Sequence, residues 1–334
     1  MIATAAAASN ETETSFCCGP LEVRVHARGA LLAKFAETLR LYDLRWEEPL
    51  VTIDVFAERA TAEPARAGGS TLQCSRMNVD VSNEGVYAST RSGACAKQSA
   101  GDSAWHVEVP DALIEAGALE ELEDIVSLVL TEGWRAAGWV PIHGAAVARD
   151  GRCAIVCAAT GGGKTTLTAS LVRAGWRTLG DDKLLLRMRD GEPELAALLH
   201  TFNLHPRTHE WFPEVGSLEH LPRYSAWTEK RKVRAKTIWP EMGALRARPT
   251  RLVLLERSAE HSEIRTTSLQ RTDVFETLLR QIVIPRDPRR AAPIVKTAAA
   301  TCSRISGVRL EIGTDAYADP RSGAAIERAV FGEP

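Results

Sequence analysis

The sequence lacks long apolar runs and paired-cysteine motifs. Its 334 residues contain no run of about 18 apolar residues, so we expect no membrane-spanning helix. The seven cysteines include no C-x-x-C pair, which argues against a structural zinc site and a redox dithiol. The number of cysteines is odd, and two of them lie in one apolar segment. Both observations favour a reducing compartment. We therefore predict a cytoplasmic protein.

The sequence also lacks an excess of charge of either sign. Its 41 Lys and Arg residues against 43 Asp and Glu residues give a net charge of −2. Such a balance argues against a general nucleic-acid or anionic-membrane surface, so we expect neither partner. Residues 1–16 are rich in Ala, Ser, Thr and Glu, and they contain neither the basic region nor the apolar region of a secretory signal. We predict that they form a flexible tail.

Residues 17–137 have the pattern of a β-rich domain with a connecting helix. Alternating or β-branched residues predict strands at 21–26, 50–56, 72–81, 85–89 and 105–109. One helix is expected at 31–42. Helical spacing from Pro110 to Trp139 predicts the helix that leads into the next domain. We find no catalytic constellation in this region.

The segment 153–167 predicts a buried strand, a glycine-rich turn and the start of a helix. It contains most of the P-loop pattern G-x-x-x-x-G-K-[ST], in which glycines let backbone N–H groups point at a phosphate. The predicted nucleotide-binding residues are Thr160, Gly161, Gly162, Gly163, Lys164, Thr165 and Thr166. Lys164 would contact the β- and γ-phosphates, and the Thr165 hydroxyl would bind Mg²⁺.

One departure from the motif and one alternative interpretation bear on this prediction. Ala158 occupies the position of the first motif glycine, which leaves the loop geometry open. The alternative is a strand-to-helix turn that binds no ligand. That alternative leaves the Lys164 ammonium unexplained, because a positive charge is unfavourable at the positively charged start of a helix.

Three more residues complete a candidate catalytic set. His143 precedes a small apolar strand, and the turn Asp150–Gly151 predicts a hairpin that places His143 in the sheet of the P-loop. Asp181 and Asp182 follow the helix and a short strand. One carboxylate can hold Mg²⁺ opposite Thr165, and the other can take a proton from an attacking hydroxyl or water. An Asp-Asp surface turn is the alternative, and the P-loop before it favours function.

The second half, residues 138–334, alternates strands and helices and predicts a layered α/β domain. Further strands are expected at 176–179, 183–188, 250–256 and 308–312, and helices at 165–174, 272–283, 294–302 and 323–331. Pro288 and Pro293 are expected to interrupt helical structure. The irregular segment 199–239, rich in aromatic and basic residues, predicts a lid or substrate-binding loop. Its basic run could neutralise a transferring phosphoryl group or could be a solvated loop.

Three motifs together resemble a known family. The order and spacing of His143-Gly144, the Gly-Gly-Gly-Lys-Thr loop and Gly180-Asp181-Asp182 are similar to those of the HPr kinase/phosphorylase catalytic domain and its kinase relatives. Those relatives include peptide kinases of lasso-peptide-type gene clusters. The resemblance covers about residues 139 to 315 and is most specific over 141 to 188. It implies an α/β fold with a P-loop core of the HPr kinase / phosphoenolpyruvate carboxykinase type, beside a smaller β-rich N-terminal region.

The resemblance also implies residue roles. Residues 160–166 would bind the phosphates, and Thr165 with one aspartate, assigned as Asp182, would bind Mg²⁺. Asp181 or Asp182 would be the general base, assisted by His143. A basic residue near the transferred phosphate corresponds to Lys230, Arg231 or Lys232, of which we assign Arg231. The family suggests a homo-oligomer.

These roles predict a Mg²⁺- and ATP-dependent kinase for a Ser or Thr hydroxyl of a peptide or small protein, in a setting such as natural-product biosynthesis. Three alternatives stay open: GTP as the nucleotide, a small-molecule hydroxyl as the acceptor, and a non-catalytic nucleotide-binding regulatory module. The glycine-rich signature that accompanies phosphorylase activity has no counterpart after the Asp pair, so we do not expect that activity.

Overall fold

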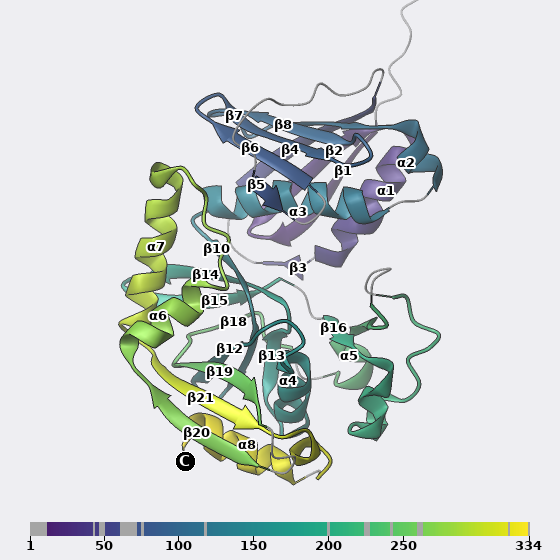
Figure 1. Cartoon of the computed structure of the whole chain (residues 1–334). Helices are drawn as coiled ribbons and strands as arrows, with labels where there is room; N and C mark the ends of the chain where they lie inside the picture. The colour runs from purple at the N-terminus through teal and green to yellow at the C-terminus, as the bar shows by residue number, and fades with distance from the viewer. Residues whose placement is uncertain are drawn as a thin grey trace, which may run out of the picture. The chain divides into compact units, whose positions relative to one another are not determined.

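The chain is a mixed α/β protein with two compact units, Met1–Ala137 and Gly138–Pro334. The computed structural model describes residues 12–42, 44–46, 51–60, 72–74, 77–116, 119–198, 201–223, 228–240, 243–258, 263–319 and 321–332. The helices and strands of both units are labelled in Figure 1.

The N-terminal unit is built on one nine-stranded sheet with the order β3-β1-β2-β4-β9-β8-β7-β6-β5. The strands are β1 (Thr12–Gly19), β2 (Leu21–Ala27), β3 (Leu44–Arg45), β4 (Val51–Arg59), β5 (Leu72–Cys74), β6 (Met77–Ser82), β7 (Gly85–Thr90), β8 (Cys95–Ser99) and β9 (Trp105–Val109). The helices are α1 (Gly29–Leu39), the 3-10 turn η1 (Arg40–Tyr42), α2 (Asp111–Ala116) and α3 (Leu119–Ala136). In β2 and β9, buried and more exposed residues alternate, so one face of the sheet packs inside the unit.

Several predictions for this unit need correction. The flexible tail was placed at 1–16, but β1 begins at Thr12 because Phe16 and Cys18 are buried and the strand pairs with β2. Residues 1–11 lie outside the described residues. The predicted strand 72–81 is two strands, β5 and β6, and β8 was missed. The predicted connecting helix is divided into α2 and α3, with residues 117–118 outside the described part.

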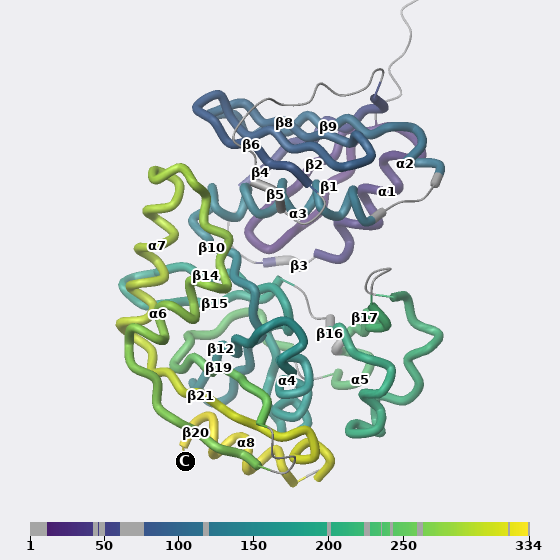
Figure 2. Tube along the Cα trace, viewed as in Figure 1, coloured from purple at the N-terminus to yellow at the C-terminus, as the bar shows by residue number. Residues whose placement is uncertain are grey.

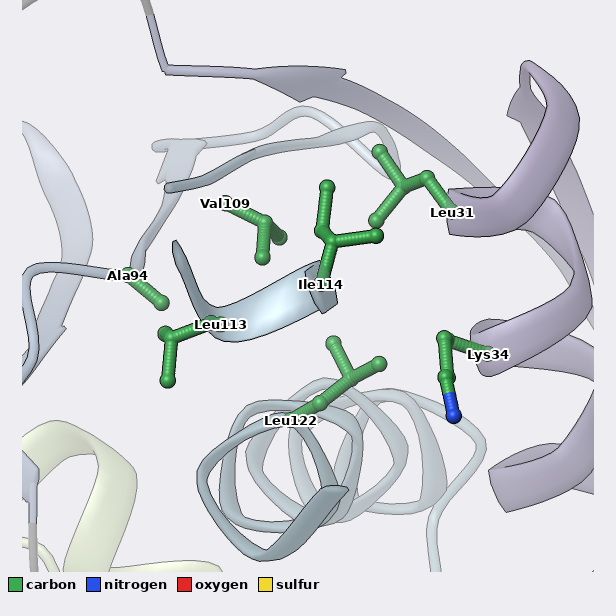
Figure 3. A pocket seen from close by; sticks show the side chains of 7 residues that line it. All are labelled: Leu31, Lys34, Ala94, Val109, Leu113, Ile114 and Leu122. Atoms are coloured by element: carbon green, nitrogen blue, oxygen red, sulfur yellow. The ribbon is translucent and has the colours of Figure 1, made fainter. Parts of the chain in front are cut away.

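A small hollow lies among α1, α2 and α3 of this unit. Figure 3 shows aliphatic side chains, such as those of Leu31, Ile114 and Leu122, pointing toward one another around it. Its volume is about 10 Å³. That is close to the space of a single water molecule, so the hollow cannot hold a substrate.

The C-terminal unit contains a six-stranded sheet, β13-β11-β12-β19-β21-β20, a four-stranded sheet, β10-β14-β15-β18, and the pair β16-β17. The strands are β10 (Val140–His143), β11 (Ala145–Arg149), β12 (Arg152–Cys157), β13 (Arg177–Gly180), β14 (Lys183–Arg189), β15 (Glu192–Ala197), β16 (Thr201–Leu204), β17 (Arg231–Arg234), β18 (Arg246–Ala247), β19 (Arg251–Arg257), β20 (Ile264–Leu269) and β21 (Ser306–Ile312). β12, β19 and β21 run parallel, whereas β11, β13 and β20 are antiparallel to their neighbours.

Helices cover both faces of the six-stranded sheet (Figure 1). They are α4 (Lys164–Arg173) and α8 (Ser322–Phe331) on one face and α6 (Arg271–Leu279) on the other. The unit also contains α5 (Ala235–Ile238), α7 (Pro288–Cys302), which contacts β14 and β15, and the 3-10 turns η2 (Pro206–Glu210), η3 (Pro213–Val215) and η4 (Thr314–Tyr317). Leu171 of α4 and Ile326 of α8 share one core with Val253 and Leu310 of the sheet. On the opposite face Gly307 lies against Val274 of α6, where an added Cβ would come within 2.2 Å of that side chain.

The predicted hairpin is correct, but the predicted sheet of His143 is not. β11 and β12 pair around Asp150 and Gly151, whose positive φ angles of 50° and 75° suit a tight hairpin turn. His143, however, ends β10, which pairs with β14 in the four-stranded sheet. The chain changes sheets at Gly144, whose amide donates to the Asp182 carbonyl at 3.1 Å.

The predicted interruption at Pro288 and Pro293 is also wrong, because α7 begins at Pro288 and continues through Pro293. Proline suits the first helical position, and Asp287 caps the helix by accepting from the Arg289 amide at 3.0 Å. Figure 2 shows β16 beside α4, and Phe212 and Leu218, which follow β16 in the chain, share a core with Ala169 and Val172 of α4. Across the described residues, we find no helix that is both long and apolar enough to cross a membrane.

Candidate active site

The predicted strand, loop and helix are present as β12, residues 158–163 and α4. Gly161 and Gly163 have φ angles of 73° and 98°, a left-handed conformation that favours glycine. Gly162 has no room for a side chain, because a Cβ there would lie 2.9 Å from both the Ala158 Cβ and the Ala159 oxygen. Each of the three loop glycines is therefore required by the backbone.

The Ala158 side chain, which replaces the first glycine of the motif, lies beneath the loop. It is 5% exposed and belongs to the core beneath the loop, together with Leu167 and Leu255. The methyl group thus stabilises the base of the loop and does not occupy the space above it. The Ala158 carbonyl lies 3.4 Å from the Lys164 ammonium and helps to position it.

A cleft of about 530 Å³ lies above the loop. It brings together most of the predicted site residues: His143, Thr160, Gly161, Gly162, Gly163, Lys164, Thr165, Thr166, Asp181 and Asp182. The loop and α4 form its floor, and residues from β16 and η2 form one wall. The last residues of β19 and β21, together with residues of η4, form the other wall.

One set of contacts links Lys164, His143 and Asp182. The Lys164 Nζ lies 3.1 Å from Nε2 of His143, and the Nδ1 of His143 lies 3.2 Å from Oδ1 of Asp182. A neutral imidazole with its proton on Nδ1 satisfies both contacts, accepting from the ammonium and donating to the carboxylate. The His143 side chain is half exposed, and its partial burial lowers the pKa of the imidazole against the opposing effect of Asp182, which favours that neutral form. Burial likewise lowers the pKa of Lys164.

A second set of contacts links Thr165 and Asp181. The Thr165 hydroxyl donates to Oδ2 of Asp181 at 2.9 Å, and the backbone amide of Asn203 donates to the same oxygen at 3.1 Å. Asp181 is 4% exposed, and burial, with a further effect of the Asp182 charge, raises its pKa to about 7. Asp182 is more accessible, with a side chain 23% exposed. The two adjacent aspartates therefore have different surroundings.

Thr165 and Asp181 fit the requirements of Mg²⁺. Both present oxygen, and Mg²⁺ typically takes one or two protein oxygens and completes its octahedron with phosphate and water. Sequence reasoning assigned Thr165 and Asp182 as metal ligands, but the structure places Asp181 beside Thr165. In the described part of the chain, no group of three or more His, Cys, Asp and Glu side chains is placed to hold a metal ion by itself.

Arg231 is not among the residues that line the cleft. It lies in β17 opposite Leu204, and its guanidinium donates to the Leu221 carbonyl at 3.0 Å, so it supports the wall from behind. Its neighbour Lys230 lines the cleft instead. Since successive residues of an extended chain point in opposite directions, composition alone could not choose between them.

Trp211 belongs to the segment 199–239, which was expected to form a lid or substrate-binding loop, and it lines the cleft; sequence reasoning missed Arg257 and Tyr317 in the opposite wall. Arg257 ends β19, next to β12, and donates to the Gly161 carbonyl at 3.0 Å. The Tyr317 hydroxyl is buried, and no described residue forms a hydrogen bond with it. Burial raises the pKa of Tyr317. The position of Arg257, at the carboxyl end of a strand parallel to β12, is the one sequence signal that could have revealed this wall.

The chain was compared with known proteins in three ways. No protein-family model matches it, and no curated protein does. Among solved structures it is similar to the Hpr(Ser) kinase/phosphatase from Coxiella burnetii, with 8% sequence identity and a TM-score of 0.28. That similarity covers 52% of this chain and 85% of the other.

Proposed function

We propose that the protein is a Mg²⁺- and ATP-dependent kinase that phosphorylates a Ser or Thr hydroxyl of a peptide or small protein. The observation that carries this proposal is the meeting of two sets of contacts in one P-loop cleft. Lys164, His143 and Asp182 form one set, and Thr165 and Asp181 form the other. A protein that only bound nucleotide would need the loop and one acidic metal ligand, not the contact between Asp182 and His143.

The nucleotide phosphates would lie over the loop. The glycine-rich backbone and the first amides of α4 supply N–H donors, and Lys164 supplies a positive charge for the β- and γ-phosphates. Thr165 and Asp181 would hold Mg²⁺, which when bound neutralises charge on the β- and γ-phosphates. The nucleoside would extend toward Trp211 and Tyr317, whose rings offer an apolar surface for a base.

The acceptor hydroxyl would approach the γ-phosphorus from the side of Asp182. As its oxygen bonds to phosphorus, the bond from phosphorus to the β,γ-bridging oxygen breaks and ADP leaves. The hydroxyl proton passes to the Asp182 carboxylate, which His143 orients through its Nδ1 proton. The basic residue beside the transferring phosphoryl group, assigned from the sequence as Arg231, would be Lys230, because Lys230 lines the cleft.

Further observations bear on the acceptor and on the location of the protein. A peptide acceptor is favoured by the family resemblance and by the wall from β16 and η2, which gives the cleft a broad polar side. No disulfide joins the described cysteines at 17, 18, 95, 153, 157 and 302, which suits the proposed cytoplasmic location. The homo-oligomer and the setting in natural-product biosynthesis stay predictions.

Replacement of Asp182 by Asn tests the proposal. We expect phosphate transfer from γ-labelled ATP to a pool of Ser- and Thr-containing peptides to fall about 10²- to 10⁴-fold, the usual contribution of a general base. ATP affinity, measured by calorimetry, should change little. Asp190→Asn is the matched control, since the Asp190 side chain is 95% exposed in a turn of the same unit. Unchanged transfer by Asp182→Asn would reject Asp182 as the base.

A further inference from the structure

The two edge strands of the six-stranded sheet, β13 and β20, differ in what covers them. At β13 the Thr178 carbonyl accepts from the Ala244 amide at 2.9 Å, so another segment of the chain closes this edge. β20 is the outermost strand on the other side (Figure 1), and no described residue forms a backbone hydrogen bond with its outer edge. Alternate N–H and C=O groups of β20 therefore point away from β21 without a partner in the described part of the chain.

The sequence of β20 leaves this edge open to pairing. Natural edge strands are commonly protected by Lys, by Pro or by a bulge. β20 contains neither Lys nor Pro, and its six residues pair with β21 in one uninterrupted register. Residues 265–268 are exposed. Such an edge can accept an additional strand from a peptide.

A groove of about 570 Å³ lies beside this edge, formed by β20, the start of β21 and the last turn of α8. Ser268 is the register partner of Val308, whose side chain shares a core with Ile326 of α8, so Ser268 lies on the α8 side of the sheet. Thr266, Ser268 and Ser306 line the groove, and their hydroxyls can each donate and accept a hydrogen bond. These hydroxyls suit a ligand that carries peptide N–H and C=O groups.

Three arginines also line the groove: Arg251, Arg271 and Arg328. None of them forms an ion pair with a described residue. Arg251 is held in place, because its Nε donates to the Ser306 hydroxyl at 3.1 Å and its Nη1 donates to the Val330 carbonyl at 2.6 Å. Burial lowers the pKa of Arg251, as expected of a half-buried cation whose partners are neutral.

The neighbouring carboxylates are engaged elsewhere. Glu327 of α8 forms ion pairs with two arginines of β11 and β12. Glu311 of β21 pairs with Arg265 of β20 at 3.9 Å, and both lie on the sheet face opposite to the groove, because the next residue of β20 lines the groove. Asp273 of α6 accepts from the Gln270 amide at 3.2 Å and caps its own helix. The described lining of the groove therefore keeps three positive charges that no carboxylate balances.

We propose that the groove and the outer edge of β20 bind an acidic peptide segment, which pairs with β20 as an additional strand. The backbone N–H and C=O groups of the segment would pair with those of β20. Its Asp and Glu side chains would pair with Arg251, Arg271 and Arg328, whose planar guanidinium groups suit carboxylates. β19 begins at Arg251 in the groove and ends at Arg257 in the P-loop cleft, about 20 Å away, so the docked segment leaves the cleft free.

The groove favours this occupant over two others. The phosphates of single-stranded nucleic acid would also suit the arginines, but the described residues that line the groove include no aromatic ring on which a base could stack. A second copy docked through the same edge in a two-fold contact would bring a second set of unpaired arginines instead of carboxylates. An acidic peptide brings both the complementary charge and the backbone groups that the edge of β20 lacks.

The first experiment measures binding of fluorescently labelled peptides to the full chain by anisotropy, without nucleotide. The acidic probe alternates Glu and Val over about eight residues, enough to span β20. One control probe has Gln at each Glu position. The other keeps every Glu but is N-methylated at two adjacent central residues, which removes one amide donor from each edge of the peptide. We expect both controls to bind at least about fivefold more weakly than the acidic probe. No binding of the acidic probe, or equal binding of either control, would overturn the proposal.

Variants locate the binding surface. We expect Arg271→Gln with Arg328→Gln to weaken binding of the acidic probe about 5- to 10-fold, because two charge pairs are lost. Arg280→Gln with Arg321→Gln is the matched control, since both side chains are exposed in the same unit and neither lines the groove. Unchanged binding by the groove variant, equal loss in the control variant, or tighter binding of an oligothymidylate at the groove would each reject the acidic peptide.

Competition with ATP separates the groove from the P-loop cleft. Saturating ATP should leave the affinity of the acidic probe within about twofold, because the groove and the cleft lie at opposite ends of β19. Displacement of the probe by ATP would place the probe in the cleft and reject the groove. The probe carries no hydroxyl, so its binding does not depend on the proposed kinase activity.

One more variant tests the charge of the groove. Glu333 follows Gly332, which lines the groove, and lies outside the described residues. Because the acidic probe should bind with Glu333 in place, Glu333→Gln should leave its affinity within about fivefold. A probe that binds only to Glu333→Gln would show that Glu333 already neutralises the arginines, and would reject the proposal.

Discussion

The two units treat buried charge in opposite ways. In the N-terminal unit Glu132 is buried, but Arg135 lies one helical turn later and forms an ion pair with it at 2.7 Å. In the described part of the C-terminal unit, the ammonium of Lys164 contacts a carbonyl and an imidazole instead of a carboxylate. The carboxylate of Asp181 contacts a hydroxyl and an amide.

This difference distinguishes a structural charge from a binding charge. A buried charge without an opposite charge costs several kcal/mol, so a fold retains it where a ligand supplies the missing partner. Phosphate would supply it for Lys164, and a divalent cation would supply it for Asp181. The comparison therefore predicts that the buried charges of Lys164 and Asp181 matter for ligand binding and that the buried ion pair of Glu132 with Arg135 matters for stability.

The largest effect on ligand binding should come from Lys164→Ala. Removing the ammonium takes away the positive charge that faces the phosphates, so ATP affinity should fall about 10²-fold. Calorimetric titration measures this loss, and Lys296→Ala, on an exposed position of α7, should bind ATP as the wild type does. ATP affinity that survives Lys164→Ala would mean that this ammonium has only a structural role.

Asp181→Asn should act on the metal. With one of two proposed protein ligands weakened, the Mg²⁺ affinity of the nucleotide-bound protein should fall about 10- to 100-fold. ATP affinity measured in EDTA should stay within about twofold, because Asp181 does not face the phosphates directly. A titration of Mg²⁺ at saturating ATP checks both values. An equal loss with and without Mg²⁺ would assign Asp181 to the fold rather than to the metal.

Glu132→Gln should lower stability and leave ligand binding unchanged, the reverse of the two preceding variants. It breaks the ion pair with Arg135, so the free energy of unfolding of the N-terminal unit should fall by about 1–3 kcal/mol. Urea unfolding followed by tryptophan fluorescence reports this change, since Trp134 lies in the same helix. ATP affinity should not change. A large loss of ATP affinity here would break the distinction between the two units.

The smallest effect should come from Ala158→Gly. It removes a buried methyl group and adds backbone freedom, so the free energy of unfolding should fall by about 1–2 kcal/mol. Ala159→Gly is the matched control, because Ala159 is exposed and loses only the backbone term. ATP affinity should not improve in Ala158→Gly, although it restores the glycine of the motif. Tighter ATP binding would show that the Ala158 methyl group does restrict the loop.

The sequence could predict the loop but not the partners of its residues. Residues 153–167 form a strand, a turn and a helix through local signals, namely an apolar run and three glycines. The pairing of Asp181 with Thr165 and of Asp182 with His143 depends on which way each adjacent side chain points and on the change of sheet at Gly144. Those depend on tertiary packing.

β1 and the contribution of Tyr317 to the cleft also could not be predicted, because neither has a local sequence signal. β1 has polar residues at Thr12 to Ser15 and is fixed by pairing with β2, so it has little local signal. Tyr317 reaches the cleft from η4, more than a hundred residues after the P-loop, and no motif marks it.

The most direct test of the central claim is a single-turnover experiment with wild-type protein, Mg²⁺ and γ-labelled ATP in the presence of a pool of Ser- and Thr-containing peptides. Mass spectrometry then identifies the labelled atoms, and chromatography counts ADP. The account predicts phosphate on Ser or Thr oxygens, with one ADP formed for each phosphopeptide. Tight ATP binding with no label on any hydroxyl would contradict it.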